Sequence, residues 1–324
     1  MIKSFQIKNF KSIQHLKLDC RRVNLFIGEP NTGKSNILEA IGLLSHIYHG
    51  DLGRFVRLET MRDLFYDHIL ENKVSISFDE KVLEITFKEG LFTGRYYDGK
   101  AHSRIFDYGY VVSGPKQTSH PDFSQFKFYR FAVIERFPIQ QSEFLRPPDG
   151  DNLLSVILTR KELRTLTKRI FDQFGLTLVF EPQEGKIKVQ KQLEDIVIAF
   201  PYSLASETLQ RVVFYLTAIY SNKNSILAFQ EPEAHAFPYY TKYLAEIIAL
   251  DKNENQYFIS THNPYLLLSM LEKTSKTEIA IFNTYWENHQ TKVKALTEDE
   301  IKAVLEKGID IFFDIERFQV KRGR

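Results

Sequence analysis

The chain has 324 residues, of which 43% are apolar and 26% are charged, and its formal net charge is +2. This composition is that of a folded chain with one large or two ordinary domains, and it excludes a disordered protein and one that coats nucleic acid by net charge alone. The single cysteine, Cys20, excludes an internal disulfide framework. Without an apolar run of membrane-spanning length or a signal-peptide core, we expect a cytoplasmic protein that does not enter a membrane.

The amino-terminal part predicts a hairpin that leads into a buried strand. Residues 2–10 and 13–18 alternate apolar and polar side chains, as the two strands of a hairpin do. Residues 23–27 form an apolar run that is typical of a buried strand, and residues 36–44 have the apolar period of an amphipathic helix. The order is therefore strand, loop, helix.

The loop at residues 28–35 fits the phosphate-binding pattern G-x-x-x-x-G-K-[ST] without a mismatch. Two glycines let the backbone curl so that its N–H groups point at phosphate oxygens, and the helix dipole adds to that field. We expect Lys34 to reach the outer phosphates and Ser35 to place its hydroxyl on Mg²⁺. The other predicted nucleotide contacts here are Gly28, Asn31, Thr32, Gly33 and Asn36. A chance glycine-rich loop is the competing interpretation.

The middle of the chain predicts an antiparallel lobe and then a helical segment. Short alternating runs between turn residues indicate an antiparallel meander over residues 74–78, 82–87 and 91–97. Beyond it we expect a strand at residues 126–134, one helix at 152–174, and strands on both sides of 183–185 and at 195–200.

The last third alternates strands with helices. The apolar periods predict helices at residues 206–220, 234–250 and 264–271, and strands at 225–229, 256–260 and 278–282. Strands that alternate with helices indicate a parallel sheet covered on both faces. The strand before the phosphate loop most naturally joins that sheet, so we expect contacts between the two ends of the chain.

Four segments together resemble the ABC-type ATPase heads of the RecF, SMC and OLD group: residues 9–13, 33–41, 230–235 and 260–264. The resemblance spans both ends of the chain and most of the predicted parallel sheet. It implies an α/β fold, a P-loop NTPase of ABC-ATPase type with a mostly parallel core sheet flanked by helices and an antiparallel β meander lobe. It also implies ATP and Mg²⁺ as ligands, and two heads that pair face to tail around ATP as a homodimer or higher homo-oligomer.

On this resemblance we expect a single head over residues 1–324. Its nucleotide-binding core would be formed by residues 1–50 and 195–290, with an antiparallel β and helical lobe inserted at 73–190 and a carboxyl-terminal tail at 291–324. The tail is too short for the nuclease domain of OLD-type proteins, so we expect a separate effector protein. Residues 296–324 of the tail are a candidate docking face, and packing against its own head is the alternative.

The resemblance assigns the catalytic residues. Glu231 corresponds to the catalytic glutamate that polarises the attacking water, and His262 to the histidine that contacts the terminal phosphate. A capping glutamate and an ordinary loop histidine are the competing interpretations. Gln230 stands where the family usually has an aspartate, so it would meet Mg²⁺ only through a water, without a negative charge. An ATPase with this substitution is expected to be slow.

Further contacts with the nucleotide are assigned in the same way. Ser206 looks like the signature hydroxyl that caps the ATP of the partner subunit, although a simple helix cap explains it equally well and Thr208 replaces the usual glycine. Lys11 and Ser12 match early nucleotide contacts of the family. Gln140, or its neighbour Gln141, lies where a metal-sensing glutamine is expected.

The expected function is an ATP-binding and ATP-hydrolysing dimerising switch, the ATPase component of a DNA-associated or defence-type system. A non-hydrolysing ATP-sensing scaffold is the first alternative, and a transporter nucleotide-binding subunit is disfavoured by the residue 9–13 segment and the meander. DNA is kept as a possible partner, although the stripe of Arg160, Arg164 and Lys168 is better interpreted as a solvated helix face.

Overall fold

The structure of the chain is a computed structural model that describes residues 1–111, 116–117, 120–307, 312 and 315–319. Its core sheet, within these residues, contains β3 (Val23–Gly28), β9 (Phe126–Tyr129), β13 (Ile226–Gln230), β14 (Gln256–Ser260), β15 (Ile279–Glu287) and β16 (Gln290–Ala295). The strand order is β16-β15-β3-β14-β13-β9, and every neighbouring pair is parallel except β15 with β16. The predicted, mostly parallel core sheet is confirmed.

Both faces of the core sheet are covered, which explains why its strands are unbroken apolar runs. The covering helices are α1 (Lys34–His49), α5 (Glu207–Ser221), α6 (Pro238–Ala249) and α7 (Pro264–Lys273). Because successive residues of a strand point to opposite faces, Phe26 and Phe258 belong to the hydrophobic core with α1, whereas Leu25 and Ile259 belong to the core with α5, α6 and α7. Two hydrophobic cores therefore flank one sheet.

The antiparallel sheet has seven strands among the described residues, in the order β2-β1-β4-β5-β6-β7-β8. Their bounds are β1 (Ser4–Phe10), β2 (Ile13–Asp19), β4 (Val74–Phe78), β5 (Lys81–Lys88), β6 (Leu91–Tyr97), β7 (His102–Tyr108) and β8 (Lys116–Gln117). The predicted hairpin and meander are confirmed. The hairpin also joins the meander, because β1 pairs with β4, and their common apolar face packs against α1.

The helical lobe corrects two predictions. Its elements are α3 (Leu153–Thr159), α4 (Lys161–Asp172), β10 (Thr177–Glu181), β11 (Lys186–Leu193) and β12 (Ile196–Pro201). The single helix predicted at residues 152–174 is wrong, because Arg160 has extended backbone angles, φ −112° and ψ 108°, that separate α3 from α4. The strand predicted at 126–134 ends at Tyr129, since the core sheet offers no further pairing there.

The last third corrects the start of one helix. The helix predicted from residue 234 begins at Pro238, because His235 has a left-handed φ of 57° and proline favours the first helical turn. The chain continues through α8 (Glu298–Lys307). Of the candidate docking tail, Ile315 and Phe318 are buried, so this part packs against its own head, while residues 308–311, 313–314 and 320–324 lie outside the described residues.

Shorter helical turns connect these elements. They are α2 (Leu52–Phe55), and the 3-10 helices η1 (Met61–Leu64), η2 (Tyr66–His68), η3 (Pro121–Phe123), η4 (Tyr202–Leu204) and η5 (Ile315–Phe318). None of the helices in the described part of the chain combines the length and apolar character needed to cross a membrane.

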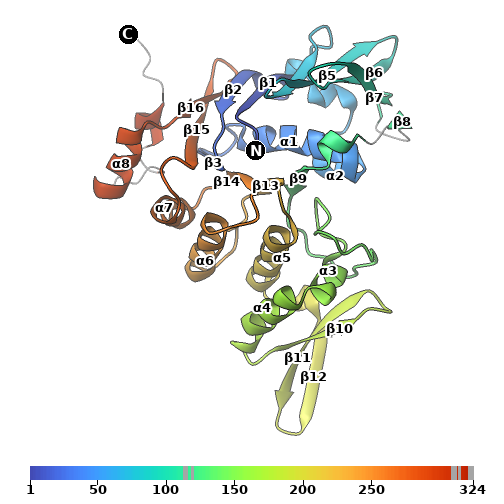
Figure 1. The fold of residues 1–324 in the computed structure, drawn as a ribbon, viewed down its shortest axis with the longest axis vertical. Coiled ribbons are helices and arrows are strands. Elements are labelled where there is room, and N and C mark those ends of the chain that lie inside the picture. Colours follow the sequence, from blue (N-terminus) through green and yellow to red (C-terminus); the bar gives the residue numbers. More distant parts are fainter. Residues whose placement is uncertain (112–115, 118–119, 308–311, 313–314, 320–324) are drawn as a thin grey trace.

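Figure 1 shows how these parts are stacked. The antiparallel sheet lies at one end of the molecule above α1, and the core strands separate α1 from α5, α6 and α7. The three-stranded sheet of β10, β11 and β12 projects at the opposite end, beyond α4. Because β3 ends at Gly28 and α1 begins at Lys34, the loop between them lies at the edge of the core sheet where its parallel strands end.

Candidate nucleotide-binding site

The phosphate loop has a backbone that only glycine permits at two positions. Gly28 and Gly33 have φ values of 146° and 97°. A Cβ atom on Gly33 would lie 2.0 Å from Oγ1 of Thr291, and one on Gly28 would lie 2.3 Å from the backbone oxygen of Thr284. The motif glycines are thus required both by the curl of the loop and by its close packing on β15 and β16.

Side chains of the loop hold its shape from within. Thr32 is buried, and its Oγ1 donates to the backbone oxygen of Glu29 at 2.8 Å and lies 2.8 Å from Oγ1 of Thr284. Asn31 is exposed and has a left-handed φ of 63°. The structure therefore gives Thr32 a role in shaping the loop, while its predicted contact with nucleotide stays a prediction.

Lys34 carries the positive charge of the loop and is almost fully buried. Its Nζ donates to the backbone oxygens of Gly28 at 2.8 Å and Glu29 at 2.6 Å. Burial lowers the pKa of the ammonium to about 8, and the opposing charges of Glu231 and Glu29 limit this decrease. The ammonium thus lies inside the loop, within the electrostatic influence of a carboxylate from the end of β13.

Ser35 and Gln230 meet across the core sheet. Nε2 of Gln230 donates to Oγ of Ser35 at 3.1 Å, although the two residues are 195 positions apart. The other amide atom, Oε1, is buried and has no hydrogen-bond partner among the described residues. A hydroxyl and an unsatisfied amide oxygen beside a phosphate loop fit an oxygen-liganded Mg²⁺ that keeps several waters.

Glu231 and His262 lie side by side at the ends of β13 and β14. His262 Nε2 and Glu231 Oε1 are 3.6 Å apart, and both side chains are more than one-third exposed. Burial and the charge of Lys34 lower the pKa of His262, and Glu231 opposes that decrease. The imidazole is therefore mainly neutral at pH 7. At 3.6 Å the two atoms are also beyond hydrogen-bond distance, so they make a close polar contact and no hydrogen bond.

Backbone contacts place Glu231 next to the turn that carries His262. Glu231 has a left-handed φ of 45°, and its N–H donates to the backbone oxygen of Ser260 at 3.1 Å. The carboxyl ends of adjacent parallel strands meet at one edge of a sheet, which explains why residues following β13 and β14 come together. Lys34, Ser35, Gln230, Glu231 and His262 are thus brought to one place.

Comparison with known proteins matches both halves of this site. Residues 1–124 match the family described as "AAA ATPase domain", and residues 155–269 match the family described as "AAA domain, putative AbiEii toxin, Type IV TA system". A DNA replication and repair protein RecF of Caldanaerobacter subterraneus is 33% identical over 117 residues, which are 36% of this chain and 25% of that protein.

Two solved SMC heads share the fold. The SMC head bound to the C-winged helix domain of ScpA superposes with a TM-score of 0.54 at 15% identity, covering 92% of this chain and 98% of that one. The SMC head with an extended coiled coil, bound to the carboxyl-terminal domain of ScpA derived from Pyrococcus furiosus, gives 0.52 at 13% identity, covering 97% and 99%. The matched family models are thus those of AAA ATPase domains, and the fold is that of the SMC heads.

The matches to curated relatives are partial. An uncharacterised protein of Methanocaldococcus jannaschii is 33% identical to this chain over 92 residues, which are 24% of this chain and 42% of that protein. The chain therefore spans less than half the length of either of these curated relatives. The predicted fold class is confirmed.

The early residues Lys11 and Ser12 take different positions in the structure. Ser12 lies beside the phosphate loop, because its Oγ accepts from Nδ2 of Asn36 at 2.6 Å and lies 2.7 Å from Oγ1 of Thr291. The ammonium of Lys11 pairs with the buried carboxylate of Glu39 and donates to the backbone oxygen of Arg57. Lys11 lines a cavity of about 690 Å³ with Arg57, so its contact with nucleotide stays a prediction.

Ser206 and Gln140 lie in other parts of the structure. Ser206 is exposed at the amino terminus of α5, beside a cavity of about 560 Å³ with an apolar lining that includes Leu204 and Phe237. Gln140 lines a cavity of about 440 Å³ in the helical lobe. Within the described residues, no residue of the phosphate loop lines either cavity, and the roles of both residues stay predictions.

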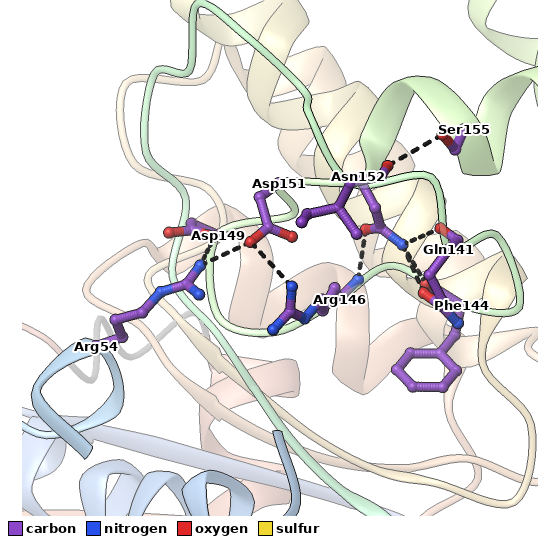
Figure 2. Close-up of polar contacts among 9 residues, drawn as sticks. Arg54, Gln141, Phe144, Arg146, Asp149, Asp151, Asn152 and Ser155 are labelled. Atoms are coloured by element: carbon purple, nitrogen blue, oxygen red, sulfur yellow. Dashed lines mark hydrogen bonds and ion pairs between the residues drawn. The ribbon is translucent and has the colours of Figure 1, made fainter. Parts of the chain in front are cut away.

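Gln141, the alternative to Gln140, belongs to a structural turn. Nδ2 of Asn152 donates to the backbone oxygens of Gln141 at 2.7 Å and Phe144 at 2.8 Å, and the Gln141 side chain lies against Asn152 (Figure 2). The same turn is tied to α2, because Arg54 pairs with Asp149 at 2.6 Å (Figure 2). This network joins the helical lobe to the α1 side of the core sheet.

Several residues at the site were not predicted. Thr284, Thr291, Glu39 and Glu233 have buried side chains that shape the loop or its neighbours. Thr284 is 252 positions from Thr32 and Thr291 is 279 positions from Ser12, and no local pattern marks the two threonines. Glu39 could have been found, because a charged residue at an inward position of an apolar helix signals a buried partner.

Proposed function

We propose that this chain is an ATP-driven dimerising switch that hydrolyses ATP slowly and acts through a separate effector protein. The observation that best supports it is the convergence of Lys34, Ser35, Gln230, Glu231 and His262 at one edge of the core sheet. These are the side chains that phosphoryl transfer needs for positioning and charge stabilisation. Residues 1–50 and 195–290 would act as the nucleotide-binding core.

The binding part of the site follows from the loop. Lys34 would exchange its two backbone carbonyl acceptors for the outer phosphates of ATP, which are stronger acceptors because they are charged. Gly28, Asn31, Thr32 and Gly33 would present backbone N–H groups to the phosphates. Mg²⁺, held by the Ser35 hydroxyl and through water by Gln230, would neutralise part of the phosphate charge.

The hydrolytic part depends on the pair at the ends of β13 and β14. Glu231 would accept a hydrogen bond from the attacking water and increase its nucleophilicity. Neutral His262, 3.6 Å from that carboxylate, can donate a hydrogen bond to the terminal phosphate without neutralising Glu231. Gln230 places no negative charge in the metal shell, which supports slow turnover.

Replacing Gln230 tests this account of the metal shell. We expect Gln230→Asp to tighten Mg²⁺ about tenfold and to raise kcat, because a carboxylate adds a charge where Oε1 is unsatisfied. ATPase rates measured over a Mg²⁺ titration report both quantities, and exposed Gln183→Asp serves as the control. If Gln230→Asp lowers both Mg²⁺ affinity and kcat, the amide itself is required and the slow-turnover account fails.

ATP-dependent self-association tests the switch as a whole. Ser206 is exposed at the amino terminus of α5 and has no described contact with its own phosphate loop, which supports a contact in trans with the ATP of a second copy. We expect Glu231→Gln to sediment as a dimer with ATP and as a monomer without it. Adding Ser206→Arg should keep it monomeric, whereas Ser103→Arg, at the exposed start of β7, should not.

Two outcomes would contradict ATP-dependent dimerisation. A monomer under both conditions would remove the dimerisation step. A dimer that is unchanged without ATP would mean that a different interface holds the subunits together.

The effector is proposed to be a protein, and the biological setting a defence-type or DNA-associated system. One matching family is described as a putative AbiEii toxin of a type IV system, and the similar SMC heads are bound to domains of ScpA, which supports a partner protein. DNA remains the second candidate. The guanidinium groups of Arg160 and Arg164 donate to the backbone oxygens of Glu143 and Leu158, which favours the protein.

A non-hydrolysing ATP-sensing scaffold is the alternative function. The uncharged amide of Gln230 in the metal shell favours it, and so does Thr208, whose Oγ1 donates to the backbone oxygen of His235 at 2.8 Å. ATP-dependent dimerisation without phosphate release by the wild-type chain would support this alternative.

A further inference from the structure

Glu233 is a buried carboxylate next to the candidate site that no step of the proposed mechanism uses. Its side chain is 5% exposed, Oε1 accepts from Oγ1 of Thr261, and Oε2 is buried without a hydrogen-bond partner among the described residues. Burying a carboxyl group costs free energy that hydrogen bonds must offset, so the hydrogen bond from Thr261 is central to the role of Glu233. The contacts of Thr261 identify what is held.

Thr261 fixes the turn that carries His262. It is fully buried, its N–H donates to the backbone oxygen of Phe26 at 3.0 Å, and its Oγ1 accepts from the N–H of Asn263 at 3.0 Å. A hydroxyl has one proton to donate. Because that proton goes to Glu233, a lone pair of the same oxygen is directed at Asn263, and the residues on both sides of His262 are fixed.

Glu233 also belongs to the turn that carries Glu231. The N–H of Ala234 donates to the backbone oxygen of Glu231 at 3.1 Å, and the N–H of Ala236 donates to that of Glu233 at 3.0 Å. This turn is therefore closed by its own backbone. The side chain of Glu233 extends from this turn to Thr261, in the turn that follows β14.

We propose that Glu233 is a positioning residue that, through Thr261, holds the turn of His262 against the turn of Glu231. The geometric part of this proposal stands on the contacts above, and its consequence for hydrolysis rests on the proposed function. Burial raises the pKa of Glu233 to about 7, against the lowering effect of the Thr261 hydrogen bond. Both protonation states keep an acceptor oxygen for Thr261, so Glu233→Gln should conserve the role and Glu233→Ala should remove it.

The first test measures the coupling of Glu231 to His262 without nucleotide. The pKa of His262 is followed by NMR in the full chain, with its signal assigned by His262→Asn. The charged groups that act on His262 are Lys34 and Glu231. In the wild-type background, Glu231→Gln should lower the His262 pKa, because an opposing negative charge is lost. In the Glu233→Ala background, Glu231→Gln should change the His262 pKa little. In the Glu233→Gln background, it should lower the His262 pKa as much as in the wild type.

The second test measures turnover. Glu233→Ala should lower kcat about tenfold or more with KM for ATP changed less than about twofold, since only the alignment of the reacting groups is lost. Thr261→Val should match it, Thr261→Ser and Glu233→Gln should stay near wild type, and the double variant Glu233→Ala/Thr261→Val should be no slower than either single variant. The control is Glu246→Ala, an exposed glutamate on α6 that pairs with Lys273.

The outcomes separate this proposal from the proposed function. The positioning role is overturned if the coupling of Glu231 to His262 persists in Glu233→Ala. It is also overturned if the wild-type chain hydrolyses ATP and Glu233→Ala has the same kcat. A wild-type chain that releases no phosphate refutes proposed hydrolysis, while the NMR coupling still decides the role of Glu233. A lower melting temperature in Glu233→Ala with unchanged coupling would assign Glu233 to stability alone and would also overturn the proposal.

Discussion

Lys34→Ala is expected to abolish ATP binding. The substitution removes the ammonium that faces the outer phosphates, and charge-assisted bonds to phosphate are among the strongest polar contacts in proteins. We expect the affinity measured by calorimetry to fall by about a hundredfold or more, which corresponds to about 3 kcal/mol. Lys188→Ala is the matched control, because Lys188 is a lysine of β11 that pairs with Glu181 in the helical lobe.

The same ammonium gives wild-type binding a pH dependence with a definite sign. ATP binds the charged form of Lys34, whose pKa without nucleotide is lowered to about 8. Below pH 8 the ammonium is already charged and affinity should be flat. Above it, binding must first protonate Lys34, so affinity should fall by up to about tenfold per pH unit. Unchanged affinity in Lys34→Ala would contradict the assignment of Lys34, whereas a flat profile to pH 9.5 would contradict the lowered pKa of its ammonium.

Glu231→Gln is expected to stop hydrolysis while it preserves ATP binding. The amide keeps the size of the side chain but cannot act as a base toward water, and such a base contributes about 10²- to 10⁴-fold to rate. We expect kcat, measured by phosphate release, to fall by at least about a hundredfold while ATP affinity changes by less than about threefold. Glu246→Gln controls for removal of a glutamate charge elsewhere on the surface.

His262 provides a second check on that result. The Nε2 atom of His262 lies 3.6 Å from Glu231, and its proposed role is to donate a hydrogen bond to the terminal phosphate. Because a glutamine amide can also donate one, His262→Gln should lower kcat less than Glu231→Gln does. Wild-type turnover in Glu231→Gln would remove Glu231 from the base position. Loss of ATP affinity in the same variant would show that its carboxylate is needed for binding.

Much of the fold could be predicted because its signals are local. The core strands are apolar runs, and the meander alternates with the period of a strand. The errors arose where the backbone departs from a side-chain pattern that continues. The apolar period runs unbroken through residues 152–174, yet Arg160 is extended and splits the segment. His235, with its left-handed φ, likewise delays α6 until Pro238.

The candidate site divides in the same way. The phosphate loop and the positions of Gln230, Glu231 and His262 at strand ends were predictable, because a strand followed by a polar turn is a local signal and parallel strands end at one edge. The packing of Thr284 and Thr291 against the loop glycines and the contact of Glu233 with Thr261 are visible only in the folded chain. Such contacts join residues from different strands, and pairing of strands is settled by burial of the whole sheet, which no short stretch of sequence records.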